Sequence, residues 1–359
     1  MTLIAVLGGG QLGRMLALAG HRLGLRFRFL DPDPDAPAGQ VADLIVGAYD
    51  DEAALRRLVE GASAVTYEFE NVPIAAAAFL EGLVGGGTAA ARLRPSSRSL
   101  EVAQDRLGEK EFFRSIGVPV QAIAAVDDRP SLESALERVG LPAVLKRRRL
   151  GYDGKGQAVI RAADELGAAW RRVGEVPSIL EAFVPFEREV SIVGARAPDG
   201  STAVHALTEN VHREGILHRS DVPATDEAAL GAVAERHLRT AMEALEHVGV
   251  LCIEFFVHDG RLIGNEMAPR VHNSAHWTIE GAVTSQFENH LRAILGVPLG
   301  DPRARGAVRM LNLVGETPSL AALLSDPEAS VHLYGKAPRP GRKLGHVTWA
   351  AATGRDRAP

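Results

Sequence analysis

At 359 residues the chain is longer than a typical single domain of roughly 100 to 200 residues, so we expect two or three domains. Its composition, 46% hydrophobic and 24% charged, is that of a globular protein and excludes disordered, collagen-like and coiled-coil classes. The 40 basic and 45 acidic residues give a formal net charge of −5, which argues against a nucleic-acid partner that requires an overall positive field. No apolar run reaches the roughly 18 residues of a membrane span, so no membrane partner is expected.

The N-terminus lacks the basic start and cleavage site of a signal peptide, and residues 3–7 are better interpreted as a first strand. The single cysteine, Cys252, allows no intrachain disulfide, and its apolar neighbours predict a buried, reduced thiol. Both features favour a cytoplasmic protein. Only five of the 40 basic residues are lysines, and a retained lysine indicates a place where a compact ammonium is needed. They are Lys110, Lys146, Lys155, Lys336 and Lys343.

Apolar patterning predicts an α/β protein whose first unit, residues 1–104, alternates strands and helices as in a doubly wound, Rossmann-like sheet. The predicted strands there are 3–7, 26–30 and 63–68, and the helices are 11–23 and 74–83. A small α+β unit follows over 105–188, with helices 106–115, 131–139 and 163–173 around strands 143–146 and 157–160.

The third predicted unit, residues 189–300, is also α+β. Its strands are 189–194, 205–209, 251–257 and 261–265, and a long helix covers 227–247. Residues 301–359 form a basic segment interrupted by proline and glycine, which we expect to pack back on the other units.

A glycine-rich turn joins the first strand to the first helix. Gly8, Gly10 and Gly13, with Asp31 ending the next strand, formally satisfy the dinucleotide-binding fingerprint and would indicate an NAD-dependent oxidoreductase. The same pattern occurs wherever a strand turns tightly into a helix whose N-terminus faces an anion. It is therefore compatible with NAD, with another phosphate ligand, or with a tight turn alone.

A second glycine-rich segment, residues 151–157, lies between the strand that ends at Lys146 and the next strand. It lacks the P-loop pattern and opens no helix, so a phosphate-binding role requires it to fold over the phosphates as a flap, with backbone amides and Lys155 as donors. A solvated basic hairpin is the structural alternative.

Two carboxylates, Glu254 and Glu266, lie twelve residues apart on neighbouring predicted strands joined at Asp259-Gly260. A strict two-residue turn would put them on opposite faces, whereas a three-residue loop would set Glu266 opposite Cys252 and on the face of Glu254. We expect the extra loop residue. Two carboxylates on apolar strands need a compensating cation, and Mg²⁺ carried with nucleotide phosphates fits, although a solvent-facing acidic pair is the alternative.

The segment 181–189 between these motifs reads as a strand, a turn and a strand. Its extended backbone suits an adenine edge, and Glu189 could accept hydrogen bonds from ribose hydroxyls. Alone, it would be an ordinary interdomain linker.

Seven motifs in order along residues 3–347 closely resemble the 5-(carboxyamino)imidazole ribonucleotide synthase family of ATP-grasp enzymes. They are GQLGRM (10–15), TYEFENVP (66–73), QDR (104–106), GYDGKGQ (151–157), NEMAPRVHNS (265–274), SQFENH (285–290) and GRKLGH (341–346). The resemblance implies a pre-ATP-grasp domain, a small lid and a C-terminal α+β domain, with ATP between the last two. It also suggests a homodimer.

By position, the resemblance assigns ATP contacts to the flap, the connector and several charged residues. These are Arg106, Lys146, Gly151, Tyr152, Asp153, Gly154, Lys155, Gly156, Gln157, Glu181, Ala182, Phe183, Val184, Glu189, His212, Asn265 and Glu266. Glu254 and Glu266 would hold Mg²⁺; Ala268 stands where many ATP-grasp enzymes have a metal-binding asparagine, so no amide ligand is expected.

The family's reaction converts ATP, bicarbonate and 5-aminoimidazole ribonucleotide (AIR) to the N-carboxylated nucleotide through carboxyphosphate, in purine synthesis. Lys146 and the flap would offset charge on the transferring phosphoryl group. The catalytic candidates are Arg270, His272, Asp153 and Lys146. The substrate candidates are Gln11, Glu70, Tyr152, Asp153, Arg270, Asn273, Ser274, Lys336, Arg342 and Lys343. Asp153, His272 and released phosphate all remain possible acceptors of the amine proton.

Three other hypotheses have distinct consequences. An NAD-dependent oxidoreductase leaves Glu254 and Glu266 unexplained. A non-catalytic ATP-binding regulator should have lost a metal carboxylate. Within the ATP-grasp enzymes, a formyl-phosphate-dependent glycinamide ribonucleotide transformylase is the nearest competitor, against which residues 273–274 and 341–346 argue.

Overall fold

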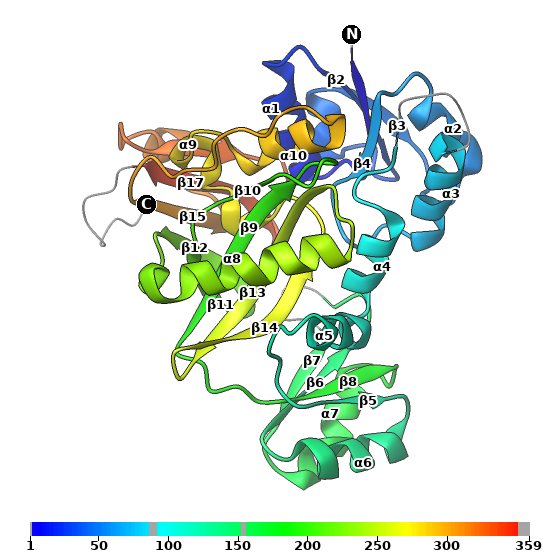
Figure 1. Ribbon diagram of the computed structural model, residues 1–359, viewed down its shortest axis with the longest axis vertical. Helices are drawn as coiled ribbons and strands as arrows, with labels where there is room; N and C mark the ends of the chain where they lie inside the picture. The colour runs from blue at the N-terminus through cyan, green and yellow to red at the C-terminus, as the bar shows by residue number, and fades with distance from the viewer. Residues whose placement is uncertain (1, 86–91, 152–155, 351–359) are drawn as a thin grey trace.

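The computed structural model describes residues 2–85, 92–151 and 156–350, which form three β-sheets with their covering helices (Figure 1). Within these residues, none of the helices has both the length and the apolar character needed to cross a bilayer.

The N-terminal sheet is parallel, in the order β3-β2-β1-β4. Its strands are β1 (Leu3–Leu7), β2 (Arg26–Asp31), β3 (Asp43–Val46) and β4 (Ala64–Tyr67). Alternate side chains of β1 enter different cores: Ile4 and Val6 pack with α1 (Gln11–His21), whereas Ala5 and Leu7 pack with α2 (Glu52–Val59) and α3 (Ile74–Gly85). Helices therefore cover both faces, which confirms the doubly wound prediction.

The small unit lies at one end of the molecule and contains an antiparallel sheet in the order β5-β8-β6-β7 (Figure 1). Its elements are β5 (Ile123–Val126), α6 (Arg129–Val139), β6 (Ala143–Arg147), β7 (Gln157–Ile160), α7 (Leu166–Arg172) and β8 (Ser178–Ala182). The helices α4 (Ser97–Gln104) and α5 (Arg106–Ser115) lead into it from the N-terminal sheet. The unit has its own apolar core beneath α6 and α7.

The large sheet has the order β14-β13-β9-β11-β12-β15-β17-β16, with β10 beside β9. Its strands are β9 (Arg188–Arg196), β10 (Thr202–Val204), β11 (Thr208–Arg213), β12 (Ile216–Val222), β13 (Gly249–His258), β14 (Arg261–Ala268), β15 (Val308–Val314), β16 (Ser330–Leu333) and β17 (Lys343–Ala350). The long helix α8 (Glu227–Ala244) covers β9, β13 and β14, while the shorter helices are α9 (Thr278–Gly281), α10 (Gln286–Leu295) and α11 (Leu320–Leu323). The 3-10 helices are Pro37–Gln40, Ala163–Glu165 and Asn273–Ala275.

Two predicted boundaries in this unit need correction, whereas the expected packing of the last segment is confirmed. The strand expected at 205–209 begins at Thr208 and runs to Arg213, and the helix expected to reach residue 247 ends at Ala244. The segment after residue 301 does pack back, but it does so by adding β15, β17 and β16 to the sheet.

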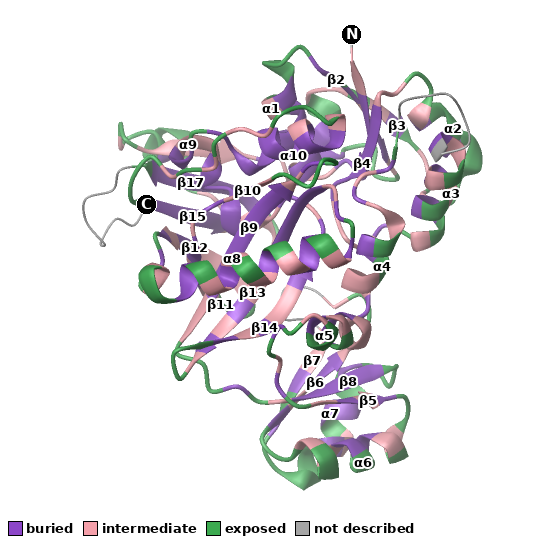
Figure 2. Ribbon diagram, in the orientation of Figure 1, coloured by how far each residue is buried: buried purple, intermediate pink, exposed green. Residues whose placement is uncertain are grey.

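One apolar core joins the N-terminal and large sheets. Side chains of α1 and β2 meet those of α10 and β13, and Leu16, Phe29, Cys252, Phe287 and Leu291 are all at most 2% exposed. Burying a side chain of this size contributes roughly 1.5 to 3 kcal/mol. Figure 2 shows buried strands, in purple, in both of these sheets. The active-site loops between these sheets are thus anchored to one shared core, and Cys252 is the buried free thiol that we predicted.

Candidate active site

The glycine-rich turn after β1 already holds carboxylates of the protein itself. The Glu68 side chain accepts hydrogen bonds from the amides of Gly10 (2.9 Å) and Gly13 (3.0 Å), and Asp31 accepts one from Gly9 (2.7 Å). A Cβ at Gly10 would lie 2.5 Å from Glu68 Oε1, so a larger residue there would displace this carboxylate. The helix N-terminus that would meet a dinucleotide phosphate is therefore occupied by Glu68, which speaks against the NAD hypothesis.

The two predicted metal carboxylates, Glu254 and Glu266, are direct cross-strand partners on β13 and β14. The turn has only the two residues Asp259 and Gly260, so our expectation of a longer loop, with Glu266 opposite Cys252, is wrong. The extra residue is Asn265, which forms a bulge opposite the Glu254/Phe255 step and shifts the register of β14 by one. This bulge brings both carboxylates to one face, as the prediction required.

The electrostatics of this pair are asymmetric. Burial and the repulsion of Glu266 raise the pKa of Glu254 to about 7. Burial would also raise the pKa of Glu266, but Arg106, whose Nη1 donates to Glu266 at 3.1 Å, and Lys146 hold it below its usual value. Two opposed carboxylates that repel each other in this way fit a divalent cation.

The flap and its cations come from the small unit. Lys146, near the end of β6, donates to Glu181 Oε2 at 2.7 Å, and Gln157 pairs with Lys146 across β6 and β7. The carbonyl of Gly151 accepts a hydrogen bond from Arg106, and Gly156 has a φ of +71° that favours glycine. The candidates Tyr152, Asp153, Gly154 and Lys155 lie outside the described residues.

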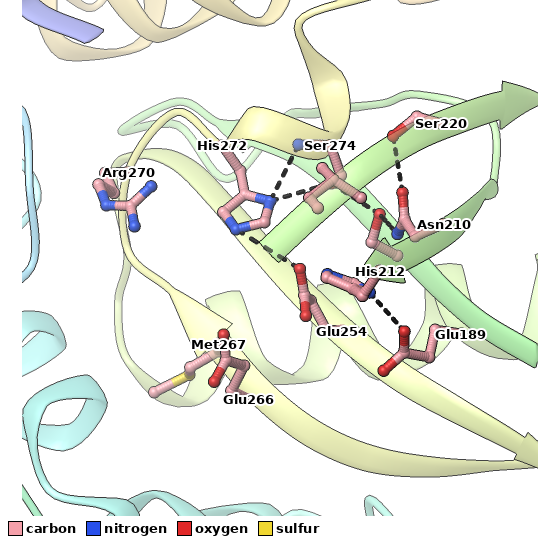
Figure 3. A network of polar contacts seen from close by, with 12 residues as sticks. Glu189, Asn210, His212, Ser220, Glu254, Glu266, Met267, Arg270, His272 and Ser274 are labelled. Atoms are coloured by element: carbon pink, nitrogen blue, oxygen red, sulfur yellow. Dashed lines mark hydrogen bonds and ion pairs between the residues drawn. The ribbon is translucent and has the colours of Figure 1, made fainter. Parts of the chain in front are cut away.

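The connector between the two units runs from Glu181 to Glu189, as predicted. The amides of Ala182 and Phe183 donate to the carbonyls of Ala122 and Pro142, so these two donors are already used within the protein. Val184 is buried. Glu189 is hydrogen-bonded to Nδ1 of His212, and both lie beside Glu254 in Figure 3. Although burial opposes it, this contact raises the pKa of His212.

The loop after β14 joins candidates from two domains. Arg270 donates to Glu70 of the N-terminal unit, and although burial would raise the pKa of Glu70, the guanidinium lowers it to about 2. Nε2 of His272 lies 3.6 Å from Glu254 Oε1, and burial followed by Arg270 lowers the pKa of His272 to about 3. Within the described residues, the buried side-chain oxygen and nitrogen of Asn273 have no partner. Ser274 is instead hydrogen-bonded to His272 and Ser191.

The C-terminal cations gather opposite this loop. Lys336 donates to Gln11 Oε1 at 2.6 Å, which joins two predicted substrate residues from opposite ends of the chain. Burial, followed by the charges of Arg342, Lys343 and Arg339, lowers the pKa of Lys336 to about 8. Arg342 donates to the carbonyl of Ala337, whereas the charge of Lys343 also acts on Glu254 and His272. The charge of Lys343 therefore acts both on Lys336, in the C-terminal segment, and on Glu254 and His272, in the active site.

Two charged residues of α5 were missed in the sequence analysis. Lys110 is fully buried, donates to the carbonyls of Gly264 and Asn265, and lies 3.9 Å from Glu181. Glu109 accepts from the amide of Met267 at 2.5 Å, and burial raises its pKa to about 8. The scarcity of lysine was the available signal for Lys110. Nothing in the sequence distinguished Glu109 from a solvent-facing helix residue.

Comparisons with known proteins identify the family of each part of the chain. Residues 1–104 match the ribonucleotide synthetase preATP-grasp domain, 111–287 the ATP-grasp domain, and 309–358 the phosphoribosylaminoimidazole carboxylase C-terminal domain. The N5-carboxyaminoimidazole ribonucleotide synthase of Pseudomonas aeruginosa is 48% identical over 97% of this chain and 94% of its own length.

Solved structures give the same relationship. The N5-carboxyaminoimidazole ribonucleotide synthetase of Thermus thermophilus superposes with a TM-score of 0.91 at 55% identity, covering 97% of this chain and 93% of that one. The Aspergillus clavatus enzyme, solved with ADP and 5-aminoimidazole ribonucleotide, superposes with a TM-score of 0.88 at 31% identity, covering 98% and 94%. The chain belongs to the N5-carboxyaminoimidazole ribonucleotide synthase family and is an ATP-grasp ligase.

Proposed function

We propose that this chain carboxylates the exocyclic amine of AIR, using ATP and bicarbonate. A bicarbonate oxygen attacks the γ-phosphorus, the bond to the leaving ADP oxygen breaks, and carboxyphosphate forms. The amine nitrogen then bonds to the carboxyl carbon, phosphate leaves, and the amine loses a proton. The observation that carries the proposal is the direct opposition of Glu254 and Glu266 beside Arg270 and His272.

Mg²⁺ would be held by Glu254 and Glu266. When bound, the ion supplies positive charge that offsets the developing negative charge on the phosphates. Arg106 is the protein's own cation at Glu266, and Lys146 is fixed by Glu181 at the lid side of the same site. These two side chains orient and neutralise the phosphates.

The remaining candidates divide between bicarbonate and nucleotide. Arg270, held by Glu70, offers a cation for bicarbonate, and the amide of Asn273, which has no partner among the described residues, offers hydrogen-bond groups. Gln11, Lys336, Arg342 and Lys343 would bind the 5′-phosphate of AIR. The flap over 151–157 would exclude water, because carboxyphosphate is lost to hydrolysis in an open site. The homodimer implied by the resemblance, and the cytoplasmic location favoured by Cys252 and the N-terminus, stay predictions.

Phosphate release tests the proposal. We expect release that requires ATP, bicarbonate and AIR together, with each omission reducing the rate to a small residual. Replacing AIR and bicarbonate by glycinamide ribonucleotide and formate tests the transformylase alternative and should give only that residual. Full activity with the second pair, or NADH oxidation without ATP use, would reject the proposal.

A further inference from the structure

A chain of buried hydrogen-bonding side chains crosses the large sheet and ends at His272 (Figure 3). Ser220 on β12 donates to Oδ1 of Asn210 on β11, Nδ2 of Asn210 donates to Ser191 on β9, and Ser191 donates to Ser274 in the loop after β14. The three distances are 2.8, 2.8 and 2.7 Å. Ser220, Asn210, Ser191 and Ser274 are each at most 5% exposed, so water does not compete for the bonds between them.

The hydrogen bonds of this network all run in one direction, with each donor on the side of Ser220 and each acceptor on the side of Ser274. The oxygen of Ser191 accepts a hydrogen bond from the Asn210 amide, and its hydroxyl donates to Ser274. The hydroxyl of Ser274 then points to Nδ1 of His272, 2.9 Å away. The backbone amide of Ser274, which can only donate, also lies 3.4 Å from the same nitrogen. The backbone contact requires a lone pair on Nδ1, and the Ser274 hydroxyl can donate to that same lone pair.

The other ring nitrogen faces the metal carboxylates. A neutral imidazole carries one hydrogen, and with the lone pair at Nδ1 that hydrogen is on Nε2. Nε2 lies 3.6 Å from Glu254 Oε1, and Figure 3 shows the ring directed toward this carboxylate. The side of His272 that faces the active site is therefore a hydrogen-bond donor.

We propose that Asn210, Ser191 and Ser274 form a positioning relay that fixes His272 in the Nε2–H tautomer, so that His272 donates a hydrogen bond in the active site and does not accept the amine proton. The tautomer stands on these contacts alone, whereas its meaning for the amine rests on the proposed function. The proton of the amine then passes to released phosphate or to Asp153, which removes one of the three acceptors left open by the sequence.

Nitrogen-15 NMR of the imidazole signals tests the tautomer in the full chain without metal or nucleotide. The H272N variant identifies the His272 signals among the 12 histidines. We expect a protonated Nε2 and an unprotonated Nδ1 near neutral pH. A hydrogen on Nδ1, or on both nitrogens, would overturn the proposal. The NMR measurement needs no turnover. The tautomer can therefore be confirmed even if the proposed reaction fails, and the reaction can be confirmed even if the tautomer is wrong.

The N210D variant tests the relay. A carboxylate at 210 only accepts, so the Ser191 hydroxyl turns toward it, and Ser274 can donate to Ser191 and leave Nδ1 free to carry the hydrogen. We expect the hydrogen of His272 to move toward Nδ1, with a kcat decrease of about tenfold and a change in KM for ATP of less than about threefold. The matched variant S220A keeps the Asn210 donor and should retain Nε2–H. An unchanged tautomer in N210D would refute the relay, and the wild-type measurement decides the tautomer even if N210D does not fold.

Discussion

Lys336 and Gln11, 325 residues apart in sequence, meet in one hydrogen bond of 2.6 Å between the C-terminal segment and the start of α1. This bond links the N-terminal unit to the basic C-terminal segment, which we expect to bind the substrate. Burial, with Arg342 and Lys343 nearby, lowers the pKa of Lys336 to about 8, so this side chain loses its charge at a much lower pH than an ordinary lysine.

The pH dependence of AIR use follows from Lys336. Since a lysine loses its charge above its pKa, binding of a dianionic phosphate should weaken as pH rises through about 8. We expect kcat/KM for AIR to fall above this pH, and the fall to move to higher pH in R342A, which removes one of the cations that lower the pKa. Profiles from pH 6.5 to 9.5 check this. An equal fall in kcat/KM for ATP would contradict it.

Removing a phosphate contact should act on one substrate. R342A or K343A eliminates a charge-assisted bond worth roughly 1.5 to 3 kcal/mol, so KM for AIR should rise by about tenfold or more. For R342A, KM for ATP should hardly change. K343A should also decrease kcat, because the Lys343 charge acts on Glu254 and His272. Steady-state kinetics with each substrate varied in turn distinguishes the two variants; an unchanged KM for AIR in both would show that this segment does not bind the phosphate.

The metal assignment is tested by Glu266→Gln. The substitution removes one of two opposed charges from a strand pair that otherwise packs normally, so we expect a folded protein with turnover reduced by more than about tenfold at saturating Mg²⁺. Circular dichroism and thermal melting provide the folding control, and Glu235→Gln on the exposed face of α8 is the matched variant. Turnover above a tenth of the wild-type value would show that Glu266 is no metal ligand.

The buried ion pairs of Glu181 should make the stability of the protein depend on pH in the acidic range. Burial opposes ionisation, but Lys110 and Lys146 lower the pKa of Glu181 to about 2 from an ordinary 4.5. A carboxylate with a lowered folded pKa stabilises the protein above pH 4.5, and this contribution is lost as pH falls toward 2. Glu181→Gln should therefore lower the free energy of unfolding by a few kcal/mol near neutral pH, on the order expected for a broken buried ion pair, and by less at low pH. Urea unfolding at several pH values measures the difference; a pH-independent cost would be the contrary result.

The elements with clear periodicity could be predicted from the sequence. The parallel N-terminal sheet follows from short apolar strands alternating with amphipathic helices, and the helix at 106–115 has the predicted bounds. The shared face of Glu254 and Glu266 was also predictable, but its cause was not. The alternation of apolar residues along β14 does not reveal the bulge at Asn265. The bulge is stabilised from outside the strand, because Lys110 of α5 donates to the Asn265 carbonyl.

Charged groups that sequence reasoning missed, such as Glu68 and Lys110, depend on tertiary contacts. Glu68, directly after β4, accepts from the amides of Gly10 and Gly13, 58 and 55 residues away in sequence, so the local fingerprint alone could not show that the protein supplies its own anion. Lys110 is buried because α5 packs on β14. Both are placed by long-range packing, which residue spacing along one segment does not encode.

The oxygen of bicarbonate provides the most direct test of the proposed reaction. If carboxyphosphate forms, a bicarbonate oxygen becomes bonded to the γ-phosphorus and leaves with the phosphate. With ¹⁸O-labelled bicarbonate, ATP and AIR, we predict that the phosphate released carries one labelled oxygen derived from bicarbonate. Phosphate without that label, at a rate equal to product formation, would contradict attack by bicarbonate on ATP.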